Sequence, residues 1–202
     1  MTGIILCGGK SSRMGTNKAF LHVGGERLID RTVRIFREIF TEVILVANEP
    51  LDYLDFDCAI ATDIIKGKGP LGGIYTGLFY ASHDHAFTAA CDMPFLDRPF
   101  IEYMRGLCAN HDIVVPKLPD GLQPLHAIYS RRCIPAIKRL LNLDQLKITG
   151  FYKGLNTLMI SEEVIRKFDP AEKIFMNVNT QEDLEMILSP LKAGKHTQNG
   201  QI

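Results

Sequence analysis

The chain has 202 residues, of which 46% are hydrophobic and 23% are charged. These fractions are typical of globular proteins and exclude a disordered or fibrous protein. Lysine and arginine number 23 together, as do aspartate and glutamate, so the formal net charge is zero. A broadly basic, nucleic-acid-binding surface is therefore excluded, and any bound anion must be held by a local cluster of charges and backbone dipoles.

The predicted elements alternate between short apolar runs and segments of helical periodicity, which is typical of an α/β fold. We expect strands at residues 3–7, 43–47, 59–62, 87–91, 113–115 and 125–129. Helices are expected at residues 28–40, 70–81, 98–108 and 132–143, and a last helix starts near residue 180. Because the strands are apolar throughout, helices should cover both faces of a mostly parallel sheet, giving three layers.

No internal repeat or linker divides the chain, so we predict a single domain over residues 1–191. Residues 192–202 lack periodicity and are expected to form a frayed tail. In open α/β sheets, ligands bind at the carboxyl ends of the strands. The loops that directly follow the strands are therefore the place to look for a site.

The cysteines and the N-terminal segment indicate in which cellular compartment the protein is expected. Five cysteines occur without the close CxxC or CxxH spacing of zinc sites, and free thiols suit a reducing cytosol. The N-terminal segment lacks the basic region of a signal peptide, and no run approaches the roughly 18 apolar residues that cross a bilayer. We expect a soluble cytoplasmic protein with no membrane and no nucleic-acid partner.

A glycine-rich loop follows the first predicted strand. Gly8 and Gly9 let the backbone approach a ligand closely, while Lys10, Arg13 and Lys18 add three positive charges with no acid among them. The pattern matches neither a Walker A motif nor a GxGxxG dinucleotide motif. It predicts an anion-binding loop, and the alternative is a solvated loop whose cations face water.

One carboxylate, Asp92, follows the apolar run at 87–91. A carboxylate in this position can bind Mg²⁺, which usually takes one or two carboxylates together with substrate phosphates. The alternative is that Asp92 caps the segment that follows it.

These two motifs resemble those of the molybdenum cofactor guanylyltransferase (MobA-like) family. Residues 6–18 carry every fixed position of that family's loop, Leu-x-Gly-Gly-x-Ser-x-Arg-Met-Gly-x-x-Lys, and residues 91–96 resemble its metal motif. The resemblance implies a Rossmann-like three-layer sandwich and places Mg²⁺ on Asp92. It also implies that Arg13 and Lys18 hold a triphosphate and that the nucleotide contacts Leu6, Cys7, Gly8 and Gly9. Cys7 stands where the family usually has alanine.

Further loops match the family less specifically. Asp63, which precedes a Gly-Pro-Leu-x-Gly segment, and Asn48 correspond to nucleotide-binding positions, although the first segment is also a well-made helix start and Asn48 could cap a turn. The resemblance places Gln123, His126, Asn177 and Asn179 on the acceptor side. From chemistry alone, His126 fits a hydrogen-bonded core or surface histidine better than a catalytic base.

The resemblance implies transfer of GMP from GTP to molybdopterin carrying molybdenum, which yields molybdopterin guanine dinucleotide and pyrophosphate. Molybdoenzymes or cofactor-insertion proteins are the partners that it implies. Two alternatives stay open. One is a cytidylyl- or sugar-phosphate nucleotidyltransferase, and the other is a non-catalytic carrier of nucleotide or molybdopterin.

Overall fold

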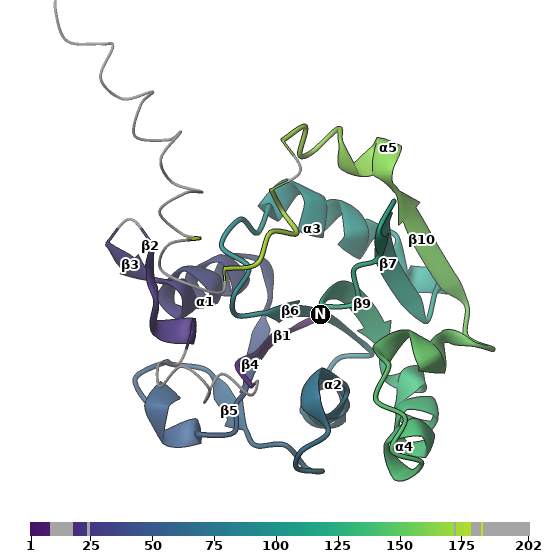
Figure 1. Ribbon diagram of the computed structural model, residues 1–202, viewed down its shortest axis with the longest axis horizontal. Helices are drawn as coiled ribbons and strands as arrows, with labels where there is room; N and C mark the ends of the chain where they lie inside the picture. The colour runs from purple at the N-terminus through teal and green to yellow at the C-terminus, as the bar shows by residue number, and fades with distance from the viewer. Residues whose placement is uncertain (9–17, 24, 172, 179–182, 184–202) are drawn as a thin grey trace, which may run out of the picture.

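The computed structural model describes residues 1–8, 18–23, 25–171, 173–178 and 183 (Figure 1). An eight-stranded sheet forms its centre, in the order β10-β7-β9-β6-β1-β4-β5, with β8 paired to β7. The strands are β1 (Thr2–Leu6), β4 (Glu42–Val46), β5 (Ala59–Ala61), β6 (His85–Ala90), β7 (Ile113–Leu118), β8 (Gly121–Leu122), β9 (His126–Ser130) and β10 (Thr157–Ser161).

The sheet is mostly parallel, as predicted. β9 runs antiparallel to both of its neighbours, β6 and β7, and β8 runs antiparallel to β7, whereas β10, β7, β6, β1, β4 and β5 share one direction. The register pairs Ala89, near the end of β6, with His126, the first residue of β9. The segment that enters β9 therefore lies at the same edge as the carboxyl ends of the parallel strands. We call this the carboxyl edge.

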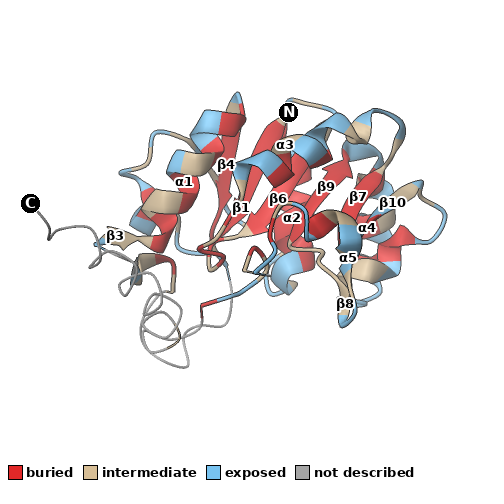
Figure 2. Ribbon diagram, turned by 90° about the horizontal axis from the view of Figure 1, so that it is seen from above, coloured by how far each residue is buried: buried red, intermediate tan, exposed pale blue. Residues whose placement is uncertain are grey.

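Helices cover both faces of the sheet, which confirms the three-layer α/β prediction. One face packs against α1 (Leu28–Ile39) and α3 (Arg98–Gly106), and the other against α2 (Gly69–Tyr80) and α4 (Ile134–Asn142) (Figure 1). The sheet between them is buried along most of its strands (Figure 2). This burial explains why the strands read as continuous apolar runs.

Local sequence explains how the helices begin and pack. Asp97 accepts a hydrogen bond from the backbone N–H of Phe100 (2.8 Å), which caps α3. In α2, Gly77 lies so close to β1 that an added Cβ atom would stand 2.6 Å from Cγ2 of Ile4. The absent side chain is what allows α2 to lie this close to the central strand.

The structure adds elements that the sequence prediction omitted. They include β8, β10, the hairpin of β2 (His22–Val23) and β3 (Glu26–Arg27), and the short helix α5 (Glu162–Ile165). α3 ends at Gly106 rather than at residue 108, and α4 begins at Ile134 after a 3₁₀ turn. Apart from Asp183, the predicted last helix and tail lie outside the described residues. Within the described ranges, no helix has the length and apolar character needed to cross a membrane.

Candidate functional site

The residues that directly follow the central strands lie at the carboxyl edge. The backbone N–H of Cys7 donates to the carbonyl of Val46 (2.8 Å), and that of Cys91 donates to the carbonyl of Leu6 (3.1 Å). Hydrogen bonding thus continues one residue beyond the ends of β1 and β6. The backbone that leads into Gly8 and Asp92 is therefore held in place by hydrogen bonds of the sheet.

Gly8 and Asn48 meet at this edge. A Cβ atom added to Gly8 would lie 3.2 Å from Nδ2 of Asn48. Two residues that the sequence assigned to one nucleotide site therefore stand in contact distance, although 40 positions separate them along the chain. Gly9, Lys10 and Arg13 from the same loop lie outside the described residues.

Asp92 and Lys18 are brought together from distant parts of the chain. Burial raises the pKa of the Asp92 carboxyl, and the positive charge of Lys18 acts in the opposite direction. Oδ1 of Asp92 is buried without a hydrogen-bond partner in the part of the chain that the structure describes. An oxygen of this kind is costly to leave alone, so it is poised to receive a cation or a donor from a ligand.

Asp63 repeats this pattern two residues beyond β5. Its Oδ1 is buried and has no hydrogen-bond partner among the described residues, and burial raises the pKa of its carboxyl. The loop is anchored because the backbone N–H of Ile64 donates to Oγ1 of the buried Thr76 in α2 (3.0 Å). Gly67 and Gly69 adopt positive φ angles of 76° and 59°, which glycine tolerates best.

The segment leading into β9 reaches the same edge. The backbone N–H of the partly exposed Gln123 donates to the carbonyl of Pro116 (2.9 Å), and the carbonyl of Leu125 accepts from the N–H of Ala90 (3.3 Å). We call residues 123–125 the 123–125 turn. Through Leu125 the turn is hydrogen-bonded to Ala90, which lies two positions before Asp92 in the sequence.

His126 lies in the core. Its ring is fully buried, and Phe87, Phe100 and Phe175 pack around it with ring centroids 4.9, 5.7 and 5.2 Å away. Burial lowers the pKa of His126 to about 3, and neither ring nitrogen has a hydrogen-bond partner among the residues described. His126 is therefore a neutral core residue here, and its ring does not reach the surface where an acceptor could bind.

A C-terminal segment passes beside Asp92. The backbone N–H of Val178 donates to the carbonyl of Asp92 (2.9 Å), which leaves the exposed Asn177 one position away from this contact. Asn179 lies outside the described residues.

Sequence reasoning did not assign any role to two buried tyrosines behind the 123–125 turn. The hydroxyl of Tyr129 donates to the carbonyl of Pro124 (2.7 Å) and lies 2.7 Å from the hydroxyl of Tyr152. The signal available was the presence of a tyrosine inside a predicted buried strand, because a buried tyrosine usually requires a hydrogen-bond partner.

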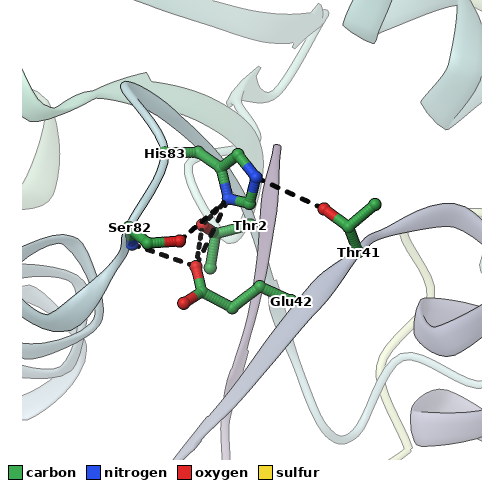
Figure 3. Close-up of polar contacts among 5 residues, drawn as sticks. All are labelled: Thr2, Thr41, Glu42, Ser82 and His83. Carbon is green, nitrogen blue, oxygen red and sulfur yellow. Dashed lines mark hydrogen bonds and ion pairs between the residues drawn. The ribbon is translucent and has the colours of Figure 1, made fainter.

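A separate polar cluster lies at the opposite edge of the sheet (Figure 3). Thr2 and the backbone N–H of Ser82 donate to one carboxylate oxygen of Glu42, and Nδ1 of His83 lies 3.4 Å from the same oxygen. Burial raises the pKa of Glu42, but these hydrogen bonds outweigh it and leave the pKa below its usual value. The cluster joins β1 and β4 to the segment between α2 and β6, so its bonds serve the fold.

The residues at the carboxyl edge fit a metal-bound anion. Within the described ranges, no group of three or more His, Cys, Asp or Glu side chains is arranged to hold a metal ion. A single carboxylate is nevertheless enough for Mg²⁺ when substrate phosphates complete its coordination. The unpartnered oxygen of Asp92, beside the cation of Lys18, fits that arrangement.

Comparison with known proteins agrees with this geometry. Residues 3–158 match the MobA-like NTP transferase domain. The molybdenum cofactor guanylyltransferase of Desulfosudis oleivorans is 42% identical over 197 residues, covering 96% of this chain and 98% of its own. A probable molybdenum cofactor guanylyltransferase of Pelotomaculum thermopropionicum is 39% identical, covering 91% and 89%. The crystal structure of molybdopterin-guanine dinucleotide biosynthesis protein A from Archaeoglobus fulgidus is similar with a TM-score of 0.82 at 27% identity, covering 96% of this chain and all of that one.

Proposed function

The chain belongs to the MobA-like NTP transferase family, and from this membership we propose that it is a molybdenum cofactor guanylyltransferase. It transfers GMP from GTP to molybdopterin-bound molybdenum, forming molybdopterin guanine dinucleotide and releasing pyrophosphate. The high identity to named guanylyltransferases over nearly the whole chain supports this choice among nucleotidyltransferases.

One observation in the structure carries the proposal. Asp92 presents a buried, unpartnered carboxylate oxygen within the electrostatic influence of Lys18, at the edge where the parallel strands β6, β1, β4 and β5 end. A carboxylate and an amine that interact electrostatically across one site can act together on a metal–triphosphate group. A structural ion pair would instead satisfy the buried oxygen directly.

The reaction needs positioning more than acid–base chemistry. A terminal phosphate oxygen of the acceptor attacks the α-phosphorus of GTP in line, and pyrophosphate leaves. Because the attacking oxygen is already anionic, no strong general base is required. Lys18, together with Arg13, holds the triphosphate and stabilises negative charge as it develops. Mg²⁺ held by Asp92 would neutralise charge on the phosphates.

The remaining site residues divide between the two substrates. Nucleotide binding is proposed for Leu6, Cys7, Gly8, Gly9, Asn48 and Asp63. The contact distance between Gly8 and Asn48 supports this grouping, as does the unpartnered oxygen of Asp63. The acceptor side is proposed for the 123–125 turn, which includes Gln123, and for Asn177 and Asn179.

The wider setting follows from the same proposal. We place residues 1–191 in a single nucleotidyltransferase domain that acts in the cytoplasm, where its five free cysteines stay reduced. A molybdoenzyme or a cofactor-insertion protein would receive the product.

A direct test measures pyrophosphate release with GTP, CTP, ATP or UTP, each with Mg²⁺, in the presence and absence of molybdenum-loaded molybdopterin. We expect release with GTP only, and only when the acceptor is present. Preferred turnover of CTP would contradict the proposal in favour of a cytidylyltransferase. Binding of GTP without turnover on a competent acceptor would instead favour a carrier.

A further inference from the structure

Two buried tyrosines behind the 123–125 turn form a chain of hydroxyl groups. Tyr129 on β9 is fully buried, and Tyr152, the last residue of a 3₁₀ turn (Ile148–Tyr152), is 9% exposed. Their hydroxyl oxygens are 2.7 Å apart, and the Tyr129 hydroxyl is also 2.7 Å from the carbonyl oxygen of Pro124. Both distances are typical of well-formed O–H···O hydrogen bonds.

The direction of the two hydrogen bonds follows from chemistry. A carbonyl oxygen can only accept, so the single hydroxyl proton of Tyr129 must point to Pro124. The hydrogen bond between the two phenols must then be donated by Tyr152. The result is a relay from Tyr152 through Tyr129 to Pro124, and each bond polarises the next in an apolar setting. Burial raises the pKa of both phenols, so both keep their protons.

The relay ends at the backbone carbonyl of Pro124. Proline has no N–H, so the carbonyl is the only backbone hydrogen-bonding group of Pro124. The residues on either side are held by the backbone bonds from Gln123 to Pro116 and from Ala90 to Leu125. The tyrosine relay is thus the side-chain contact that holds the middle of the 123–125 turn. The next residue of the turn, Leu125, accepts a hydrogen bond from Ala90 of β6, which lies two residues before Asp92.

We propose that Tyr129 and Tyr152 are positioning residues that hold the 123–125 turn in place for binding of a phosphate-bearing acceptor. This inference rests on the proposed function, since the turn borders the acceptor side of the site. Neither hydroxyl touches substrate, and both act through the carbonyl of Pro124.

The test compares Tyr129→Phe with Tyr152→Phe in steady-state kinetics with GTP and molybdenum-loaded molybdopterin. Tyr129→Phe removes both hydrogen bonds, and we expect the KM for the acceptor to rise at least fivefold while the KM for GTP stays within twofold. Tyr152→Phe leaves the bond to Pro124 intact, so its acceptor KM should rise less. Tyr103→Phe, a partly exposed tyrosine on α3, is the matched control and should change neither KM.

Amide hydrogen exchange provides a readout that does not depend on turnover. In Tyr129→Phe, the amides of Gln123 and His126 should exchange at least tenfold faster than in the wild type, and the amides of β1 should not change. An acceptor KM within twofold of wild type, or an equal rise in both KM values, would overturn the inference. If the wild type turned over no GTP, the proposed function would fail, and unchanged exchange at the turn would separately refute the positioning role.

Discussion

The carboxyl of Asp92 and the ammonium of Lys18, 74 positions apart along the chain, interact electrostatically at the carboxyl edge. Burial raises the pKa of Asp92, and the charge of Lys18 partly opposes that rise. The positive charge of Lys18 therefore favours the ionised form of Asp92, which is the form that the proposed Mg²⁺ site requires. The first two predictions remove these groups one at a time.

Asp92→Asn should lower kcat/KM at least 100-fold, which corresponds to about 2.7 kcal/mol of transition-state stabilisation. The amide keeps the size of the side chain but loses the charge that would bind Mg²⁺. Pyrophosphate release at saturating Mg²⁺ measures the effect. Asp97→Asn, five positions on, is the matched control, because asparagine also caps α3. Near-wild-type turnover of Asp92→Asn would remove Asp92 from the metal site.

Lys18→Ala should raise the KM for GTP about tenfold or more, because a hydrogen bond to a charged group contributes about 1.5–3 kcal/mol. Titration of GTP binding with Mg²⁺ present gives an independent value. Lys18→Arg keeps the charge and should recover part of the affinity. Lys138→Ala, on an exposed position of α4, should leave GTP binding unchanged. An equal affinity in wild type and Lys18→Ala would be inconsistent with a triphosphate contact.

His126 should make the stability of the protein depend on pH. Its pKa is about 3 when folded and 6.5 in its ordinary state, so below pH 6.5 the unfolded chain binds a proton that the folded chain does not. Stability is therefore lost as the pH falls from 6.5 towards 3. Relative to His126→Phe, the wild type should lose about 2 kcal/mol of unfolding free energy between pH 7.5 and pH 5. Denaturant unfolding at several pH values measures this difference. If the unfolding free energies of wild type and His126→Phe changed equally with pH, His126 would not be held neutral in the folded protein.

Gly77→Ala should destabilise the fold by about 1–3 kcal/mol, because the new methyl group would stand 2.6 Å from Ile4 in a tightly packed layer. Gly106→Ala in α3 is the control, since an added Cβ meets no atom within 4 Å there. Because alanine has a higher helix propensity than glycine, Gly106→Ala should leave the free energy of unfolding equal or slightly increased. Thermal or denaturant unfolding of both variants decides the matter, and equal stabilities would refute the close packing of α2 on β1.

The sequence predicted the central strands and main helices because buried parallel strands are continuous apolar runs and the helices have strong periodicity. β10 was missed because it has an exposed methionine, Met159, and only one neighbouring strand, so its pattern is not that of a buried strand. The hairpin at residues 22–27 has strands of two residues each, too short for any periodic signal.

For the site, spacing after strands placed Gly8, Asn48, Asp63 and Asp92 on one edge, because that rule follows from the direction of parallel strands. Side-chain burial was harder to predict. His126 begins a strand at the same edge, yet its ring points into an aromatic cluster assembled partly from Phe175, almost 50 residues later. Contacts between segments so far apart leave no local mark in the sequence. A tyrosine inside a predicted buried strand signalled that Tyr129 needs a hydrogen-bond partner, but nothing local in the sequence identified Tyr152 as that partner.

The reversed direction of β9 has a consequence for how the protein can diversify. β1 and β4 are joined through α1, and β5 and β6 through α2; each of these connections must pass over a face of the sheet, so it is constrained at both ends. Between β7 and β9 the chain instead makes an excursion at the carboxyl edge, through β8 and the 123–125 turn, and returns without a helix. Insertions or deletions in that excursion can change its length without disturbing any crossover. If the 123–125 turn borders the acceptor, as proposed, selection for a new acceptor can remodel it while leaving β1, β4, β5 and their connections intact.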